Sequence, residues 1–209
     1  MLDAVMSPAR AARYFTFDGH WGPGEELAAM RNGSGDEWSI VFSAAGALVL
    51  GFDHESEMSP AVTGHLWPGL VEEVPEAFAR HLDEPSFGLD GTLLATVCLW
   101  RRADDTRWCS GEITYPPEAD GDPDGATFLF EVLLDETPGT YQEFSEEYYE
   151  KTVDTGAVQA VLTLEPMTAD LALRLNPDVD LGALGRDAAD PGWPSVGFPP
   201  AEATALAPR

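Results

Sequence analysis

The sequence predicts an α+β fold, a mainly antiparallel sheet built from two hairpins and covered by helices. Trp38–Ser43 and Leu48–Phe52 both alternate between two kinds of residue with a period of two, on either side of Ala44–Ala47. A period of two places successive side chains on opposite faces of a strand, so this region is predicted to be the first hairpin. Thr92–Arg101 is apolar on both faces, which predicts a central strand, and Arg107–Tyr115 is predicted to return beside it.

The segment near 75–83, between the two predicted hairpins, has the pattern of a helix. Apolar residues recur every four positions near 75–83, where Pro75 is predicted to open a helix and Glu76 to pair with Arg80 on its surface.

Two later segments complete the predicted helical cover. Segment 126–136 is apolar almost all round, and Thr140 and Glu143 have the spacing of a capping box that opens a helix over 140–150. Glu25–Arg31 is rich in helix-forming residues and is predicted to be a further helix.

The length suits one large domain. We expect a single α+β domain over residues 1–185, with a smaller lobe after about residue 116 as the alternative arrangement. Five prolines in segment 186–209 predict an extended tail.

Charge narrows the class of partner. The chain has 37 Asp or Glu against 11 Lys or Arg, for a formal net charge of −26. Such a balance argues against binding to nucleic acid and to anionic membranes, because both need clustered basic residues. A genome of high GC content and adaptation to high salt each explain part of the acidity, and both explanations stay open.

The two cysteines indicate a reducing compartment. Cys98 and Cys109 are eleven residues apart, and with Trp100 opposite Cys109 they lie diagonally, a poor arrangement for a disulfide. With no visible signal peptide, the expected location is the cytoplasm.

The standard catalytic motifs are absent, including nucleotide-binding glycine loops and the serine nucleophile elbow. Asp53-His54-Glu55, with His65 nearby in sequence, is the best alternative site, because mixed imidazole and carboxylate ligands suit zinc or iron. The same residues equally suit a polar turn, in which two acids raise the pKa of a surface histidine.

A calcium-loop pattern occurs in the segment before the predicted helix 126–136. Asp120, Asp122, Asp124 and Glu131 match the spacing of the ligands in such a loop. Two neighbouring prolines and Phe128 at the ninth position fit this poorly. The simpler interpretation is that the acids stabilise the positive end of the following helix. No cofactor is therefore expected, with calcium as the alternative.

A long acidic stretch is the main candidate for partner binding. From Cys109 through Glu150 there are twelve Asp or Glu and no Lys or Arg. A negative face of this kind attracts basic proteins, although a generally acidic protein also has solvated acidic faces. The residues expected to contact a basic protein partner are Glu118, Asp120, Asp122, Asp124, Glu143, Glu146, Glu147 and Glu150.

The middle of the chain resembles a known family. Gly35-Asp36-Glu37-Trp38, a turn near Gly46, Asp53-His54-Glu55 and the run Val74–Leu82 occur in an order similar to that of the SUKH superfamily. The resemblance covers about residues 33–88. It implies an α+β binding module without catalysis, of the type that neutralises a co-encoded toxin in many bacterial immunity proteins.

The leading prediction is a non-enzymatic acidic module that binds a basic protein, of the immunity-inhibitor type. The alternative is a metal-dependent enzyme of unassigned class that uses Asp53-His54-Glu55.

Overall fold

The computed structural model divides into two compact units, which are described separately. It describes residues 1–117, 121–135 and 137–198. The sheet unit comprises Tyr14–Glu131, and the helical unit combines Met1–Arg13 with the chain from Val132 onward. The second unit thus begins later than residue 116 and includes the first residues of the chain.

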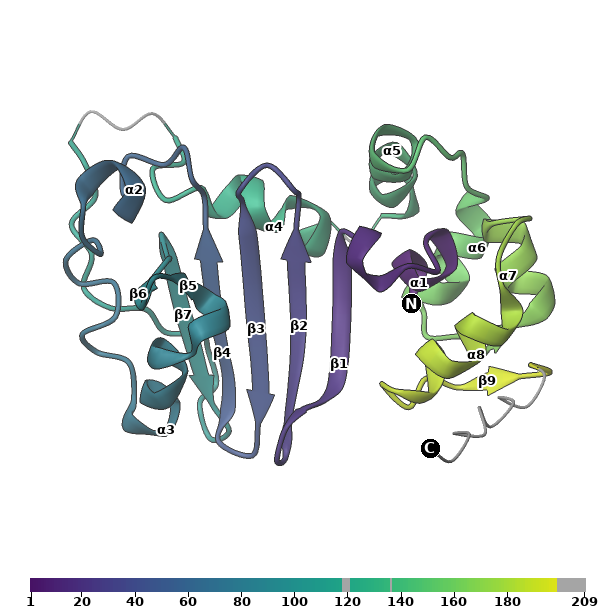
Figure 1. Cartoon of the computed structure of the whole chain (residues 1–209), viewed down its shortest axis with the longest axis horizontal. Helices are drawn as coiled ribbons and strands as arrows, with labels where there is room; N and C mark the ends of the chain where they lie inside the picture. Colours follow the sequence, from purple (N-terminus) through teal and green to yellow (C-terminus); the bar gives the residue numbers. More distant parts are fainter. Residues whose placement is uncertain (118–120, 136, 199–209) are drawn as a thin grey trace, which may run out of the picture. The chain divides into compact units, whose positions relative to one another are not determined.

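A five-stranded antiparallel sheet forms the centre of the sheet unit (Figure 1), and its strand order is β1-β2-β3-β4-β7. The strands are β1 (Phe15–Gly22), β2 (Glu25–Arg31), β3 (Glu37–Ser43), β4 (Gly46–Phe52) and β7 (Val97–Arg102). The predicted hairpin is present as β3–β4, in which Trp38 lies opposite Gly51 and Ser43 opposite Gly46, so its turn is shorter than the predicted Ala44–Ala47. Together with the helices, this sheet confirms the predicted α+β class.

The segment Glu25–Arg31 is a strand, so the prediction of a helix there is wrong. It pairs along its whole length with β3 and over most of its length with β1. Alternating burial explains the outcome, because Leu27 packs on one face of the sheet and Met30 on the other. Helix propensity is a weak preference that such tertiary pairing overrides.

β7 lies at the edge of the sheet and not at its centre, so the prediction of a central strand is wrong. The return strand predicted beside β7 is reduced to a single bridge, so the predicted second hairpin does not form along its length. Trp100 and Cys109 do lie opposite each other and exchange backbone hydrogen bonds of 2.9 and 2.8 Å. Beyond Cys109 the chain turns to a different neighbour: a Cβ on Gly69 would lie 2.1 Å from the carbonyl oxygen of Glu112. Trp67 Nε1 also donates to the carbonyl of Thr114 at 3.0 Å. These contacts hold the segment away from β7.

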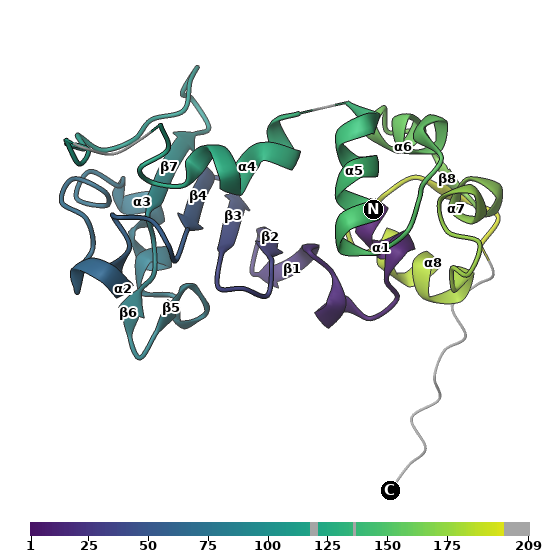
Figure 2. The ribbon, with the colours of Figure 1, turned by 90° about the horizontal axis from the view of Figure 1, so that it is seen from above.

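Each face of the sheet has its own apolar core. The helix α4 (Ala126–Leu134) lies along one face of the sheet (Figure 2). Its Leu129 and Phe130 share a core with Trp38 and Val97. The other face carries Leu48, Leu50 and Trp100 under the segment between β4 and β7. That segment contains α2 (Pro60–Thr63), α3 (Glu76–Ala79), the 3-10 turns η2 (Arg80–Asp83) and η3 (Pro85–Phe87), and the small hairpin β5 (Gly88–Leu89) and β6 (Thr92–Leu93).

Two helix predictions need correction in detail. The helix near 75–83 is α3 followed by the turn η2, and Arg80 pairs with Glu25 of β2 rather than with Glu76. The helix predicted over 140–150 is α5 (Pro138–Tyr148); it begins after Thr137, so Thr140 is not its cap. The helix predicted at 126–136 is confirmed as α4.

The helical unit packs around one core that includes Val5, Val158 and Leu175. Its elements are α1 (Leu2–Met6), the 3-10 turn η1 (Arg10–Ala12), α5, α6 (Thr155–Leu162), β8 (Met167–Thr168), α7 (Ala169–Leu175), α8 (Leu181–Ala189) and β9 (Ser195–Val196). Asn176 Nδ2 donates to the carbonyl of Val5 at 2.8 Å, which fastens α1 to α7.

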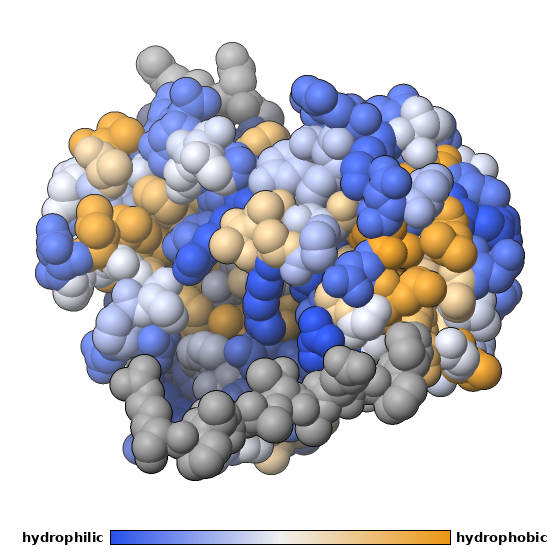
Figure 3. Space-filling view, turned by 45° about the vertical axis from the view of Figure 1, so that its right-hand side comes forward, coloured by the Kyte–Doolittle hydropathy of each residue, from blue (hydrophilic) through white to orange (hydrophobic). Residues whose placement is uncertain are grey.

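The extended tail predicted from residue 186 is wrong for residues 186–198. α8 continues to Ala189, and β9 pairs in parallel with β8. Among the described residues, no helix combines the length and apolar composition needed to cross a membrane. Apolar side chains nevertheless reach the surface in places (Figure 3), with Leu164 65% exposed in the helical unit.

Candidate functional site

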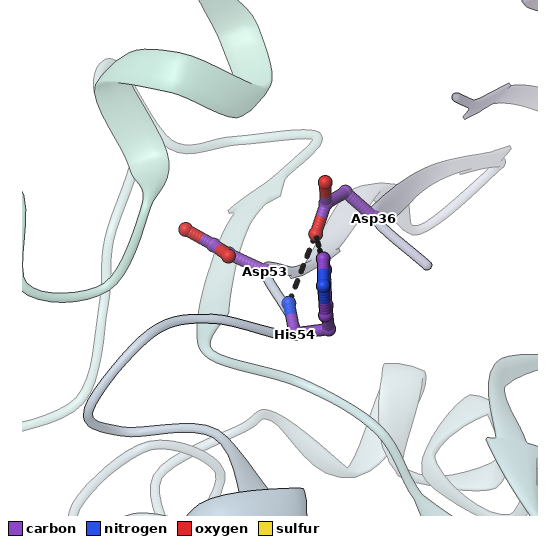
Figure 4. Close-up of side chains that lie close together, drawn as sticks. All are labelled: Asp36, Asp53 and His54. Carbon is purple, nitrogen blue, oxygen red and sulfur yellow. Dashed lines mark hydrogen bonds and ion pairs between the residues drawn. The ribbon is translucent and has the colours of Figure 1, made fainter. Parts of the chain in front are cut away.

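Asp36 and His54 meet at one end of the sheet (Figure 4). Asp36 lies in the turn between β2 and β3, and His54 follows β4. Because Glu37 pairs with Phe52, the residues just beyond this pair are brought together. Asp36 Oδ1 lies 2.6 Å from His54 Nδ1 and accepts the backbone N–H of His54 at 2.9 Å.

The carboxylate of Asp36 is held from both sides and is only 6% exposed. Asn32 Nδ2 donates to Oδ2 at 2.6 Å, while Asn32 Oδ1 accepts the backbone N–H groups of Ser34 and Asp36. Burial alone raises the pKa of Asp36, but the hydrogen bonds from His54 and Asn32 outweigh it, so the pKa is lowered. Asp36 is therefore ionised, and each of its carboxylate oxygens accepts a hydrogen bond.

The imidazole of His54 is half-buried against the turn. Gly35 has a φ of +119°, and a Cβ there would lie 3.3 Å from His54 Cγ. The hydrogen bond to Asp36 raises the pKa of His54, and the charges of Asp36, Glu55 and Asp53 add to this against a smaller effect of desolvation. The two side chains thus form an ion pair whenever His54 is protonated.

Asp53 connects this pair with the start of α4. Its Oδ1 accepts the backbone N–H of Glu55 at 2.9 Å, and its own N–H donates to Thr96 Oγ1 at 3.1 Å. Thr96 in turn donates to the carbonyl of Asp124 at 2.7 Å. A Cβ on Gly125 would lie 2.3 Å from Asp53 Oδ2, so the chain passes this carboxylate only because residue 125 is glycine.

Asp36, Asp53 and His54 are the one group of three close potential metal ligands in the described part of the chain, with ligand atoms within 4.8 Å of one another. Two ligands of one tetrahedral zinc are separated by about 3.3 Å, because each lies about 2.1 Å from the metal. The 2.6 Å between His54 Nδ1 and Asp36 Oδ1 is too short for this and suits a charge-assisted hydrogen bond. In this arrangement the three residues join two loops and the start of α4.

The partners predicted for this site from the sequence were Glu55 and His65, and Asp36 was not among them. Glu55 is exposed, and His65 Nδ1 lies 2.8 Å from the carbonyl of Leu66. A signal for Asp36 was present, because a hairpin that turns at Ala44 and Ala45 brings residue 36 opposite residue 53.

Two described residues of the calcium-loop pattern, Asp122 and Asp124, cap the N-terminal end of α4. Asp122 accepts the backbone N–H groups of Thr127 and Phe128, each at 3.0 Å, and Asp124 Oδ1 accepts that of Ala126 at 3.1 Å. Glu131 is exposed. Glu118 and Asp120, which the sequence analysis also selected, lie outside the described residues.

The other predicted contact residues gather on α5. Glu143, Glu146 and Glu147 are exposed on this helix, and Glu150 is exposed just beyond it with a φ of +54°. These four residues form the acidic face of α5. Asp122 and Asp124 belong to the sheet unit, so the predicted acidic set divides between the two units.

Comparison of the chain with protein-family models, curated proteins and solved structures finds no match.

Proposed function

We propose that this chain is a non-enzymatic module that binds a basic protein, and that the acidic face of α5 is its contact surface. One observation carries the proposal. Glu143, Glu146 and Glu147 are exposed at positions i, i+3 and i+4, the spacing that places side chains on one side of a helix, and Glu150 is exposed just beyond the end of that helix.

The stability of α5 does not account for these residues. Glu143 and Glu147 are like charges four residues apart, and such pairs destabilise a helix by about 0.2–0.5 kcal/mol. The C-terminal end of a helix also disfavours negative charge, and the last turn of α5 contains no basic residue. A surface that costs local stability is typical of a binding site.

Aromatic side chains lie on the neighbouring side of α5. Tyr148 is 38% exposed, and its ring stacks on Phe144 with centroids 5.7 Å apart and an interplanar angle of 12°. Rings beside carboxylates suit Arg and Lys, which pair with the carboxylates and lie over aromatic faces.

The specific form that we propose is an immunity-type inhibitor acting in the cytoplasm. The resemblance to the SUKH superfamily supports this form, and Cys98 and Cys109, which are free thiols, are compatible with a reducing compartment. The Asp36–His54 pair supports a binding role over the metal-enzyme alternative, because His54 Nδ1 and both carboxylate oxygens of Asp36 are engaged in joining loops.

The test is a capture experiment with two matched variants. The experiment compares the wild-type full chain with two variants in which three exposed acids are replaced. The triple variant is Glu143→Lys/Glu146→Lys/Glu147→Lys, and the control is Glu57→Lys/Glu73→Lys/Glu112→Lys. Both variants have the same net charge. We expect one basic protein to bind the wild type and the control with an association rate that falls as salt rises, and to bind the triple variant at least about tenfold more slowly. Equal rates for both variants would overturn the role of α5.

A further inference from the structure

The turn between β2 and β3 contains the Asn-Gly sequence of the chain, Asn32-Gly33. An asparagine followed by glycine is open to attack by the next backbone nitrogen on its own side chain, because glycine has no Cβ to hinder the approach. The attack closes a five-membered ring and releases the side-chain nitrogen as ammonia. In a folded protein its rate depends on the freedom of the nucleophile and on the groups that surround the amide.

The backbone nitrogen of Gly33 is accessible. Gly33 is exposed, and its N–H donates to none of the described residues. A Cβ at this position would have no heavy atom within 4 Å beyond its chain neighbours, so water and hydroxide reach the nitrogen. The φ of +80° also favours glycine over every other residue type at position 33. The conformation of the turn therefore preserves the reactive sequence.

The side-chain carbonyl of Asn32 is held by two backbone N–H groups. Its Oδ1 accepts from Ser34 at 2.8 Å and from Asp36 at 3.1 Å. When a nitrogen attacks Cγ, negative charge develops on Oδ1, and both donors are already in position to stabilise it. The turn thus supplies, for its own side chain, the two donors that an acyl-transfer site supplies for its substrate.

The amide nitrogen that leaves in this reaction contacts a buried carboxylate. Asn32 Nδ2 donates to Asp36 Oδ2 at 2.6 Å, and Asp36 is only 6% exposed. Loss of the nitrogen removes this donor, and hydrolysis of the ring puts a carboxylate oxygen in its place. Two carboxylates that share a site repel each other, and the ionised form of one is disfavoured. A change at residue 32 therefore acts directly on the partner of His54.

We propose that Asn32 is a site of spontaneous deamidation in the folded protein, and that the new carboxylate at residue 32 breaks the contact with Asp36. The N–H of Gly33 loses its proton to water as the bond from this nitrogen to Asn32 Cγ forms. The bond from Cγ to Nδ2 breaks, and the leaving nitrogen takes a proton from water and departs as ammonia. One water molecule then opens the ring. Cleavage at Cγ gives aspartate, whereas cleavage at the main-chain carbonyl of residue 32 gives isoaspartate.

Both products disturb the end of the sheet that carries the candidate site. Aspartate places its charge against Asp36. Isoaspartate lengthens the main chain of a turn that is closed by a 3.2 Å hydrogen bond from the N–H of Asn32 to the carbonyl of Asp36. Because Asp36 pairs with His54, either product loosens the connection between this turn and the end of β4. The inference does not depend on the acidic face of α5, since the turn belongs to the sheet unit.

The first test uses the second asparagine as an internal control. Asn176 precedes Pro177, whose nitrogen has no N–H to lose, so it cannot react by this route. The full chain is incubated at pH 8, folded or in urea, and peptide mapping by mass spectrometry measures conversion at both asparagines. We expect conversion at Asn32 alone, at least as fast in the folded protein as in urea. Conversion no greater than at Asn176, or about tenfold slower in the folded protein than in urea, would overturn the proposal.

The second test measures the consequence for the fold. Asn32→Asp reproduces one product, and Gln159→Glu, at an exposed amide on α6, is the control with the same change in net charge. Tryptophan fluorescence follows the sheet unit, because Trp193 alone of the six tryptophans lies in the helical unit. We expect Asn32→Asp to lower the Tm by about 3 °C or more and the control to change it by less than about 1 °C.

The same measurement on modified wild-type protein keeps the test independent of the folding of the variant. Anion exchange separates the deamidated protein, which has gained a negative charge, from the unmodified protein. We expect the deamidated protein to have the lower Tm of the two. If their Tm values are equal, the new carboxylate does not break the contact with Asp36, and the proposal is wrong.

Discussion

His54 Nδ1 lies 2.6 Å from Asp36 Oδ1, and this contact joins the turn between β2 and β3 to the end of β4. The bond is made between a half-exposed imidazole and a carboxylate that Asn32 already holds in place. It fixes the end of the sheet at which Asp53, Thr96 and α4 also converge.

The contribution of this pair to stability depends on pH. The pKa of His54 is raised from 6.5, so the stability it adds is complete below pH 6.5 and is lost as the pH rises through the folded-state pKa. The pKa of Asp36 is lowered from 3.8, so its contribution is complete above that value and is lost only as the pH falls through the lower, folded-state pKa. We expect the Tm difference between wild type and His54→Gln to be larger at pH 6 than at pH 9. A difference that does not change with pH would contradict the ion pair.

Because Gly125 passes close to Asp53, we expect alanine substitutions at Gly121 and Gly125 to lower the stability of the protein by different amounts. Gly121 and Gly125 both have positive φ, but only at Gly125 would a Cβ meet Asp53. We expect Gly121→Ala to cost about 1 kcal/mol through its backbone conformation alone. Gly125→Ala adds overpacking of about 1–3 kcal/mol. Urea denaturation measures both, and equal losses would show that the contact with Asp53 is unimportant.

Arg80 is expected to stabilise Glu25, which is buried in β2. Removing one member of a buried pair costs about 3–5 kcal/mol, but Arg80 is 63% exposed, so we expect Arg80→Ala to cost about 1–2 kcal/mol. Glu76→Ala, which removes the partner that helix spacing alone suggests, is the control and should change stability by less than about 0.5 kcal/mol. If the two variants lose similar stability in denaturant titrations, the Glu25–Arg80 pair has no structural role.

The acidic face of α5 predicts a gain in stability when its charge is removed. Glu143→Gln/Glu147→Gln abolishes a repulsive pair and one charge near the negative end of the helix, so we expect a gain of about 0.5–1 kcal/mol at low salt. The gain should shrink at high salt, where these interactions are screened. A decrease in Tm at low salt would mean that the two glutamates stabilise the fold, and it would remove the main support for a binding role.

The sequence predicted the fold class because strand periodicity is a local signal. The segments of the hairpin β3–β4 alternate with a period of two, and they pair in the structure. The errors arise where a partner distant in sequence decides. Glu25–Arg31 contains good helix formers, yet pairing with both neighbouring strands makes it β2.

The same reason limits what could be predicted of the candidate site. Asp53 and His54 are conspicuous in the sequence, but their partners Asp36 and Thr96 are far along the chain and are selected by the strand register. Likewise, Arg80 pairs with a residue 55 positions away rather than with its helical neighbour. Acidic residues on one helix could be found from spacing alone, whereas their division between two units could not.

The two cysteines are expected to differ sharply in reactivity. Cys98 is 1% exposed on β7, and burial raises the pKa of its thiol to about 12. Cys109 is partly exposed, so reagents reach Cys109, whereas Cys98 is both buried and, because a thiol reacts as its thiolate, disfavoured by its raised pKa. With Ellman's reagent at pH 8 we expect one thiol to react rapidly in the folded protein and the second only after unfolding. Cys109→Ser should abolish the rapid phase, and two equally fast thiols in the wild type would show that the core beneath β7 opens readily.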